Sequence, residues 1–327
     1  MHMICIKGMM VSIPFLFLTL LVHVMLPERN LHTKSLMLYL TTLMMAFFTL
    51  VTIHYLDLSR KIPCLLFGFF CLFFYTSSIF WINVICIDIW LTFRGQIKIL
   101  SRRKECMRFV FYSIYATSIP VTIVLIAFSI NQYGNSEAYY YPGIVTGKCF
   151  LSSKWAYLLY LHGPTGILQG FNIILFALTA LKIRKAKRET DMIRNQKDNN
   201  VTSRNSQQYY LYLKLIFIMG VNWSIELISW ALEYYTNTPL WIFYATDFLN
   251  ATYGVLIFIL FVCNKKTLNK LQKRYYQFIG KPDLARSSSG THRSTRIMSN
   301  SNFDDTNQKN EKLFRKESVH LKEYQRQ

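Results

Sequence analysis

The chain has 327 residues, of which 52% are hydrophobic and 16% aromatic, and its formal net charge is +20. The apolar residues are gathered into long blocks, such as VSIPFLFLTLLVHVML at 11–26, that show no polar helical face. A large soluble helical protein requires such faces, so the composition argues against one and indicates a membrane protein.

The basic residues are distributed unevenly between the segments that join these blocks. If the N-terminus lies outside, 31 of the 37 Lys and Arg residues fall in four cytoplasmic segments. The positive-inside rule therefore predicts a plasma-membrane protein with its N-terminus outside and its C-terminus in the cytoplasm. The membrane topology explains most of the excess positive charge, so no nucleic-acid partner is expected. The four segments are 27–35, 93–108, 182–208 and 264–327.

Seven apolar blocks predict an all-α membrane protein built as a seven-transmembrane-helix bundle. The predicted spans are about 9–26, 35–56, 64–95, 107–130, 155–181, 209–232 and 240–263. No small-residue cleavage site follows the first block, which favours a true span over a signal peptide. The third span, at about 45 Å, exceeds the ~30 Å hydrocarbon core and must tilt or protrude. In the fifth, Pro164 beside Gly163 and Gly166 predicts a helix bend.

The spans divide the chain into four parts. Residues 1–8 are the predicted extracellular N-terminus and 9–263 the transmembrane domain. Residues 264–280 predict a short amphipathic helix that lies on the inner membrane surface and contacts lipids. Its apolar residues share one helical face among Lys and Arg, and they are Leu268, Leu271, Tyr275 and Phe278.

Residues 281–327 are polar and rich in Ser, Asn, Lys and Arg, which predicts a disordered cytoplasmic tail. Serines near arginines in RSSSGTHRSTRIMSNSN, at 286–302, are candidate targets of a receptor kinase. Phosphates there would add negative charge and recruit a desensitising partner such as arrestin. A merely solvated tail is the alternative.

Ionisable residues inside membrane spans are costly, so each is first a functional hypothesis. They are Asp88, His162, Lys214, Glu226 and Asp247. Asp88 lies near the inner end of its span, shortly before Arg94, and predicts either a salt-bridged latch or a carboxylate that reaches interfacial water. Glu226 and Asp247 lie toward the outer half as candidates to contact a ligand, with hydrogen bonding between helices as the alternative.

Motifs of catalysis and cofactor binding are missing from the sequence. It contains no HExxH, GxSxG, Walker or CxxC motif, so we expect neither an enzyme nor a bound cofactor or metal. The polar residues within the spans are few and scattered, and the two halves show no internal repeat. Both observations argue against a channel or transporter.

Five long runs of sequence occur in the order found in one receptor family. They are RNLHTKSLMLYL at 29–40, FWINVICIDIWLTFRG at 80–95, FNIILFALTALKIRKAKRE at 171–189, YLYLKLIFIMGVNWSIELISW at 210–230 and GVLIFILFVCNKK at 254–266. Over about residues 29–271 the chain therefore resembles the Methuselah-like receptors of insects, a branch of the secretin-like (class B) G-protein-coupled receptors.

The resemblance implies a receptor that responds to an extracellular ligand, a peptide or an amine, by activating a heterotrimeric G protein. By position, His32 resembles the histidine of the inner polar network that holds the resting state. Gly220 resembles the glycine at which the sixth helix bends. Cys64 and Cys149 resemble the outer disulfide, and both fall on the predicted oxidising side of the membrane.

The G protein is expected to bind on the cytoplasmic side, against basic residues at the inner ends of the helices. The residues named for this role are Arg94, Arg184 and Lys214, together with the amphipathic helix.

The chain also departs from the class B pattern. Ile85 stands where the family has a glutamate, with Asp88 about a turn later, which predicts a different polar latch in which His32 and Asp88 form the inner polar network. Phe217 replaces the proline of the sixth helix, so bending would depend on Gly220 alone. Tyr253 stands before Gly254 where glutamine is usual.

Family members carry a sizeable disulfide-rich extracellular domain before the first span, whereas about eight residues precede it here. Three alternatives follow: a fragment, a truncated product that does not signal, or a receptor that binds its ligand within the bundle alone.

Overall fold

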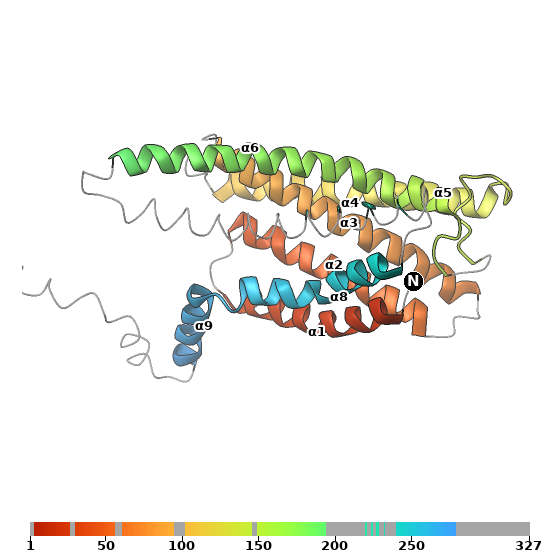
Figure 1. The fold of residues 1–327 in the computed structure, drawn as a ribbon, viewed down its shortest axis with the longest axis horizontal. Helices are drawn as coiled ribbons and strands as arrows, with labels where there is room; N and C mark the ends of the chain where they lie inside the picture. Colours follow the sequence, from red (N-terminus) through yellow and green to blue (C-terminus); the bar gives the residue numbers. More distant parts are fainter. Residues whose placement is uncertain are drawn as a thin grey trace, which may run out of the picture. The chain divides into compact units, whose positions relative to one another are not determined.

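The computed structural model describes most of the chain as helices. The described residues are 3–26, 30–55, 61–94, 102–145, 149–193 and 240–278, with Gly220, Ser224, Leu227, Ile228 and Leu232. The helices, most of them labelled in Figure 1, are α1 (Met3–Met25), α2 (Leu31–Tyr55), α3 (Lys61–Phe93), α4 (Arg102–Tyr133), α5 (Lys154–Tyr157), the π-helix η1 (Leu158–His162), α6 (Gly163–Ile193), α8 (Leu240–Phe261) and α9 (Lys265–Phe278). Most of the predicted sixth span and the predicted tail lie outside the described residues.

Five helical stretches among the described residues are long and apolar enough to cross a membrane. They are Ile6–Met25, Leu31–Tyr55, Lys61–Thr92, Arg103–Tyr133 and Lys154–Lys185. In α8 the stretch Thr252–Phe261 is apolar but shorter. Large apolar side chains on α4, such as Phe111 and Leu125, are exposed, as expected for a surface that faces lipid. The prediction of a helical membrane protein is confirmed.

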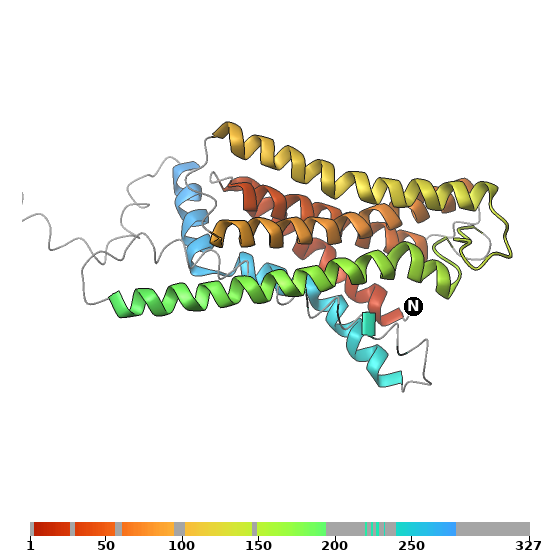
Figure 2. The ribbon, with the colours of Figure 1, turned by 90° about the horizontal axis from the view of Figure 1, so that it is seen from above.

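The long helix α3 lies at the centre of the described bundle. It packs against α2, α4 and α6, while α1 packs against α2 and α8 (Figure 1 and Figure 2). It is also the most buried of the five candidate spans. Its apolar residues occur on every face, as is typical of a helix that is surrounded by other helices or by lipid. The buried side chains of α3 include Trp81, Ile85 and Ile89.

Two small residues bring α1 and α8 into close contact. Ser12 Oγ accepts a hydrogen bond from the Gly254 N–H at 3.2 Å. A Cβ at position 254 would lie 2.6 Å from the Ser12 carbonyl oxygen, so the glycine is required for this approach. The neighbouring Tyr253 hydroxyl lies 3.0 Å from that of Tyr39 on α2, and both tyrosines are buried.

A disulfide attaches the loop after α4 to the first turn of α3. The Cys64–Cys149 bridge spans 4.8 Å between Cα atoms, which confirms the predicted pair. Gly68 lies beneath it, where a Cβ would come within 2.6 Å of the Cys149 carbonyl oxygen. The Asn131 side chain accepts from the Ile144 N–H at 3.0 Å and donates to the Ile144 carbonyl at 3.3 Å, which closes the loop upon itself.

A π-helical turn precedes Pro164 in the predicted fifth span. Proline lacks an N–H group and its ring crowds the carbonyl four residues earlier, so it disturbs the α-helical hydrogen bonds of the preceding turn. The π-helix η1 instead pairs the Gly163 N–H with the Leu158 carbonyl. A Cβ at 163 would lie 2.6 Å from that oxygen, so glycine is required there as well.

Candidate functional site

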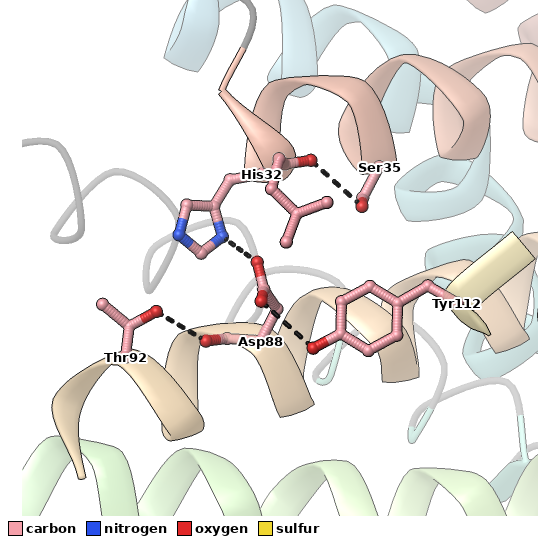
Figure 3. Close-up of polar contacts among 6 residues, drawn as sticks. His32, Ser35, Asp88, Thr92 and Tyr112 are labelled. Atoms are coloured by element: carbon pink, nitrogen blue, oxygen red, sulfur yellow. Dashed lines mark hydrogen bonds and ion pairs between the residues drawn. The ribbon is translucent and has the colours of Figure 1, made fainter. Parts of the chain in front are cut away.

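Side chains from three helices meet where α2 begins and α3 ends. His32 Nδ1 lies 2.6 Å from Asp88 Oδ2, and the Tyr112 hydroxyl of α4 donates to Asp88 Oδ1 at 3.1 Å (Figure 3). Asp88 is 1% exposed. A carboxylate buried to this degree is stable only where partners replace water at both oxygens. We call His32, Asp88 and Tyr112 the three-helix cluster.

Local structure places each member of the three-helix cluster. His32 lies in the first turn of α2, and Ser35 in that turn donates to the Leu31 carbonyl at 3.2 Å. One turn beyond Asp88, Thr92 donates its hydroxyl to the Asp88 backbone carbonyl at 2.8 Å (Figure 3). These hydroxyls bond within their own helices, so the Asp88 carboxylate remains available to α2 and α4.

Arg94 is not the partner of Asp88. Its side chain is exposed, and its guanidinium lies 5.0 Å from the centroid of the Trp90 ring, a cation–π geometry. The two alternatives of a latch to Arg94 and of contact with interfacial water are therefore wrong, whereas the predicted inner polar network of His32 and Asp88 is present. The physical reason is that the neighbouring helix α2 places His32 next to the Asp88 carboxylate, which therefore has a partner inside the protein.

A second polar network joins α3, α4 and α6. Asn83 Nδ2 donates to Asn172 Oδ1 at 2.8 Å, and the Tyr115 hydroxyl donates to Asn83 Oδ1 at 3.0 Å. Both asparagines are 3% exposed. We call these three residues the amide network. Sequence reasoning missed the amide network and also missed Tyr112. An uncharged polar side chain costs less free energy to bury in a membrane than a charged one, so such residues do not stand out in the sequence.

A buried glutamine of α6 contacts the predicted sixth span. Gln169 Nε2 donates to the Gly220 carbonyl at 2.9 Å and lies 3.4 Å from Ser224 Oγ. Gly220, the predicted bend, is thus placed against α6. Sequence reasoning did not identify Gln169 as its neighbour.

The other predicted site residues are spread over the chain. Arg184 is exposed on α6, and Pro164 lies in the first turn of the same helix. Asp247 belongs to α8, but its side chain is outside the described part of the structure, as are Lys214 and Glu226 entirely. Over the described ranges, no group of three or more His, Cys, Asp or Glu side chains is placed to hold a metal ion.

Comparison with known proteins gives a consistent result. The family model described as "7 transmembrane receptor (Secretin family)" matches residues 1–257. The chain is similar to "G-protein coupled receptor Mth2" of Drosophila yakuba, with 36% identity over 82% of this chain and 50% of that protein. It is also similar to "Probable G-protein coupled receptor Mth-like 10" of Drosophila melanogaster, with 35% identity over 82% of this chain and 48% of the relative.

A third relative, "G-protein coupled receptor Mth" of Drosophila melanogaster, is 30% identical over 81% of this chain and 52% of its own length. The chain therefore spans about half the length of the curated relatives that it matches.

Proposed function

Because this chain belongs to the secretin family of seven-transmembrane receptors, we propose that it is a G-protein-coupled receptor of the Methuselah-like branch. An extracellular ligand, a peptide or an amine, shifts a two-state bundle toward the form that binds a heterotrimeric G protein. The ligand acts only through its difference in affinity for the two states. Relatives whose names describe G-protein-coupled receptors support this function, which is signalling rather than catalysis.

The proposed architecture has seven spans with the N-terminus outside. To the five candidate spans it adds α8 and the apolar residues 209–232. Cys64 and Asp88 lie near opposite ends of α3, so a disulfide on the oxidising side puts the three-helix cluster at the cytoplasmic side. The uneven distribution of Lys and Arg supports the same orientation. Residues 1–8 then lie outside and the tail from 281 inside.

One observation carries the proposed mechanism: the buried contact of His32 with Asp88, completed by Tyr112. It ties three helices together at the end where a G protein would bind. In the resting state this cluster holds the inner ends of α2, α3 and α4 together. The proposed basic contacts for the G protein are Arg94 and Arg184, which are exposed, together with Lys214 and residues of α9.

Ligand contact and desensitisation belong to the two opposite sides of the membrane. Glu226 and Asp247 are the proposed acidic contacts for a cationic or peptide ligand toward the outer half of the bundle. A receptor kinase acts on serines of the tail, and the added charge recruits arrestin.

The test is GDP–GTP exchange on a panel of heterotrimeric G proteins in membranes that contain the full chain. We expect exchange above that of membranes without the chain, and its loss in Arg94→Ala/Arg184→Ala. The matched control is Lys61→Ala/Lys154→Ala, which removes two basic residues from the proposed outer side. The variant Asp88→Asn weakens the three-helix cluster. If both this variant and the unmodified chain give no more exchange than membranes without the chain, the proposal is contradicted.

A further inference from the structure

Gln169 is a buried amide that bonds to the backbone of another span. Its side chain is on α6 and the residue is 4% exposed. Its Nε2 donates to the carbonyl of Gly220 at 2.9 Å, where the backbone of residue 220 is helical. A helical carbonyl has a second lone pair beyond the one used by its own helix, so it can accept this additional bond. The contact therefore attaches the backbone at Gly220 to α6 without requiring the carbonyl to give up a helical hydrogen bond.

The absence of a side chain at Gly220 permits this contact. A Cβ at that position would lie 3.3 Å from Gln169 Nε2, tighter than ordinary van der Waals contact. Ser224, one turn away, adds only a longer 3.4 Å contact to the same amide. The principal bond is therefore to the backbone, and a side chain at position 220 would require the Gln169 amide to shift.

The helix that carries Gln169 is itself held by the rest of the bundle. Asn172 lies three residues later, on the neighbouring part of the same helical face. It accepts from Asn83 of α3, which in turn accepts from Tyr115 of α4. Through neighbouring residues of one face, α6 is therefore bonded both to the network of α3 and α4 and to Gly220.

From this arrangement we propose that Gln169 is a positioning residue that holds the sixth span at Gly220 in the resting arrangement and releases the Gly220 carbonyl on activation. The inference rests on the proposed function, in which the inner ends of the helices part. While the carbonyl is bonded to an amide anchored through α6, the span cannot move away from α6 at this residue. The bond thus lowers the population of the open form, in which the sixth span has moved away from α6.

The experiment measures that population directly, without a G protein. The full chain is purified in lipid nanodiscs, with Cys5, Cys106 and Cys263 changed to Ser. Nitroxide labels are placed at Arg103→Cys on α4 and Gln208→Cys, which precedes the predicted sixth span in the sequence. Electron–electron double resonance then gives the distance distribution between the two labels.

Gln169→Leu keeps the volume of the side chain and removes its donor. We expect the open population to rise roughly three- to twenty-fold, the range given by typical interhelical hydrogen bonds in membranes. Thr179→Val is the matched control, because Thr179 is also buried on α6 and its hydroxyl donates to the Leu175 carbonyl of its own helix. An unchanged distribution in Gln169→Leu, or an equal shift in the control, would overturn the proposal.

Gly220→Ala provides an independent route to the same contact. The added Cβ displaces the amide, so we expect a shift in the same direction as in Gln169→Leu. The double variant should show no more than the larger single effect, because both changes break one bond. Additive shifts in the double variant would overturn the proposal. If Gln169→Leu does not fold, the test is Gly220→Ala alone, and an unchanged distance distribution in that variant would overturn the proposal.

GDP–GTP exchange measured on the same variants separates this inference from the proposed function. A distance shift without exchange supports the role of Gln169 and contradicts coupling to the G proteins tested. Exchange by the unmodified chain without a distance shift in Gln169→Leu supports the receptor function and overturns the role of Gln169.

Discussion

Asp88 shows at the residue scale how burial decides what a charge does. Its carboxylate is 1% exposed, with His32 at one oxygen and Tyr112 at the other. The loss of one partner leaves a buried polar atom without the water that would solvate it in the unfolded chain. Such loss costs more than the net contribution of the bond itself. The three-helix cluster is therefore sensitive to changes that remove only a few atoms.

We expect His32→Ala to lower the free energy of unfolding by about 1–3 kcal/mol, because one Asp88 oxygen loses its partner. Tyr112→Phe should cost about 1 kcal/mol, since it removes a single hydroxyl. The matched control is Tyr133→Phe, which makes the same change on α4 at a side chain that is 91% exposed. Fluorescence-detected thermal unfolding of the purified chain measures all three. Equal losses in Tyr112→Phe and Tyr133→Phe would show that the cluster does not stabilise the fold.

At the scale of elements, the helices approach one another through a few small residues and buried polar contacts. The pair Ser12 and Gly254 brings α1 against α8, and Gly68 admits the disulfide-bonded loop to α3. In a bilayer the hydrophobic effect does not drive helices together, because lipid is as apolar as the helix surface. Close packing and interhelical hydrogen bonds supply the specificity instead.

Gly254→Ala tests this packing. The new Cβ would lie 2.6 Å from the Ser12 carbonyl oxygen and 2.7 Å from Ser12 Cβ, atoms that can move only with the helix. We expect a loss of about 1–3 kcal/mol from overpacking, measured by thermal unfolding. Gly170→Ala is the matched control, since a Cβ there meets nothing within 4 Å. Unfolding of Gly254→Ala at the temperature of the unmodified chain would refute the close approach of α1 and α8.

At the scale of the whole molecule, the sequence distribution of charge and the disulfide support one orientation in the membrane. Native cysteines offer a direct test, because both are exposed: Cys106 lies within the predicted cytoplasmic segment 93–108, and Cys263 directly precedes the segment 264–327. In a Cys5→Ser background, a membrane-impermeant thiol reagent should label neither on intact cells and both after permeabilisation. The chain with Cys106→Ser and Cys263→Ser sets the background. Labelling of Cys106 on intact cells would reverse the proposed topology.

Properties that depend on local sequence were predicted well. A span is set by about 20 consecutive apolar residues, so the helices from α1 to α6 were found from hydropathy, although α1 begins at Met3, before the predicted start at Met9. Pro164 disturbs its own helix by losing an N–H, and this too is local. The Cys64–Cys149 pair followed from topology and family resemblance together.

The composition and order of the apolar blocks by themselves determined that this is a helical membrane protein. Only the tertiary structure decided that Tyr112 completes the contact of His32 with Asp88, that Asn83 meets Asn172, and that Gln169 reaches Gly220. Each of these contacts joins different helices, so it depends on how each helix is rotated about its axis and how closely it approaches its neighbour. Hydropathy constrains neither quantity where every face of a helix is apolar, as in α3, because no polar face marks the side that must be buried.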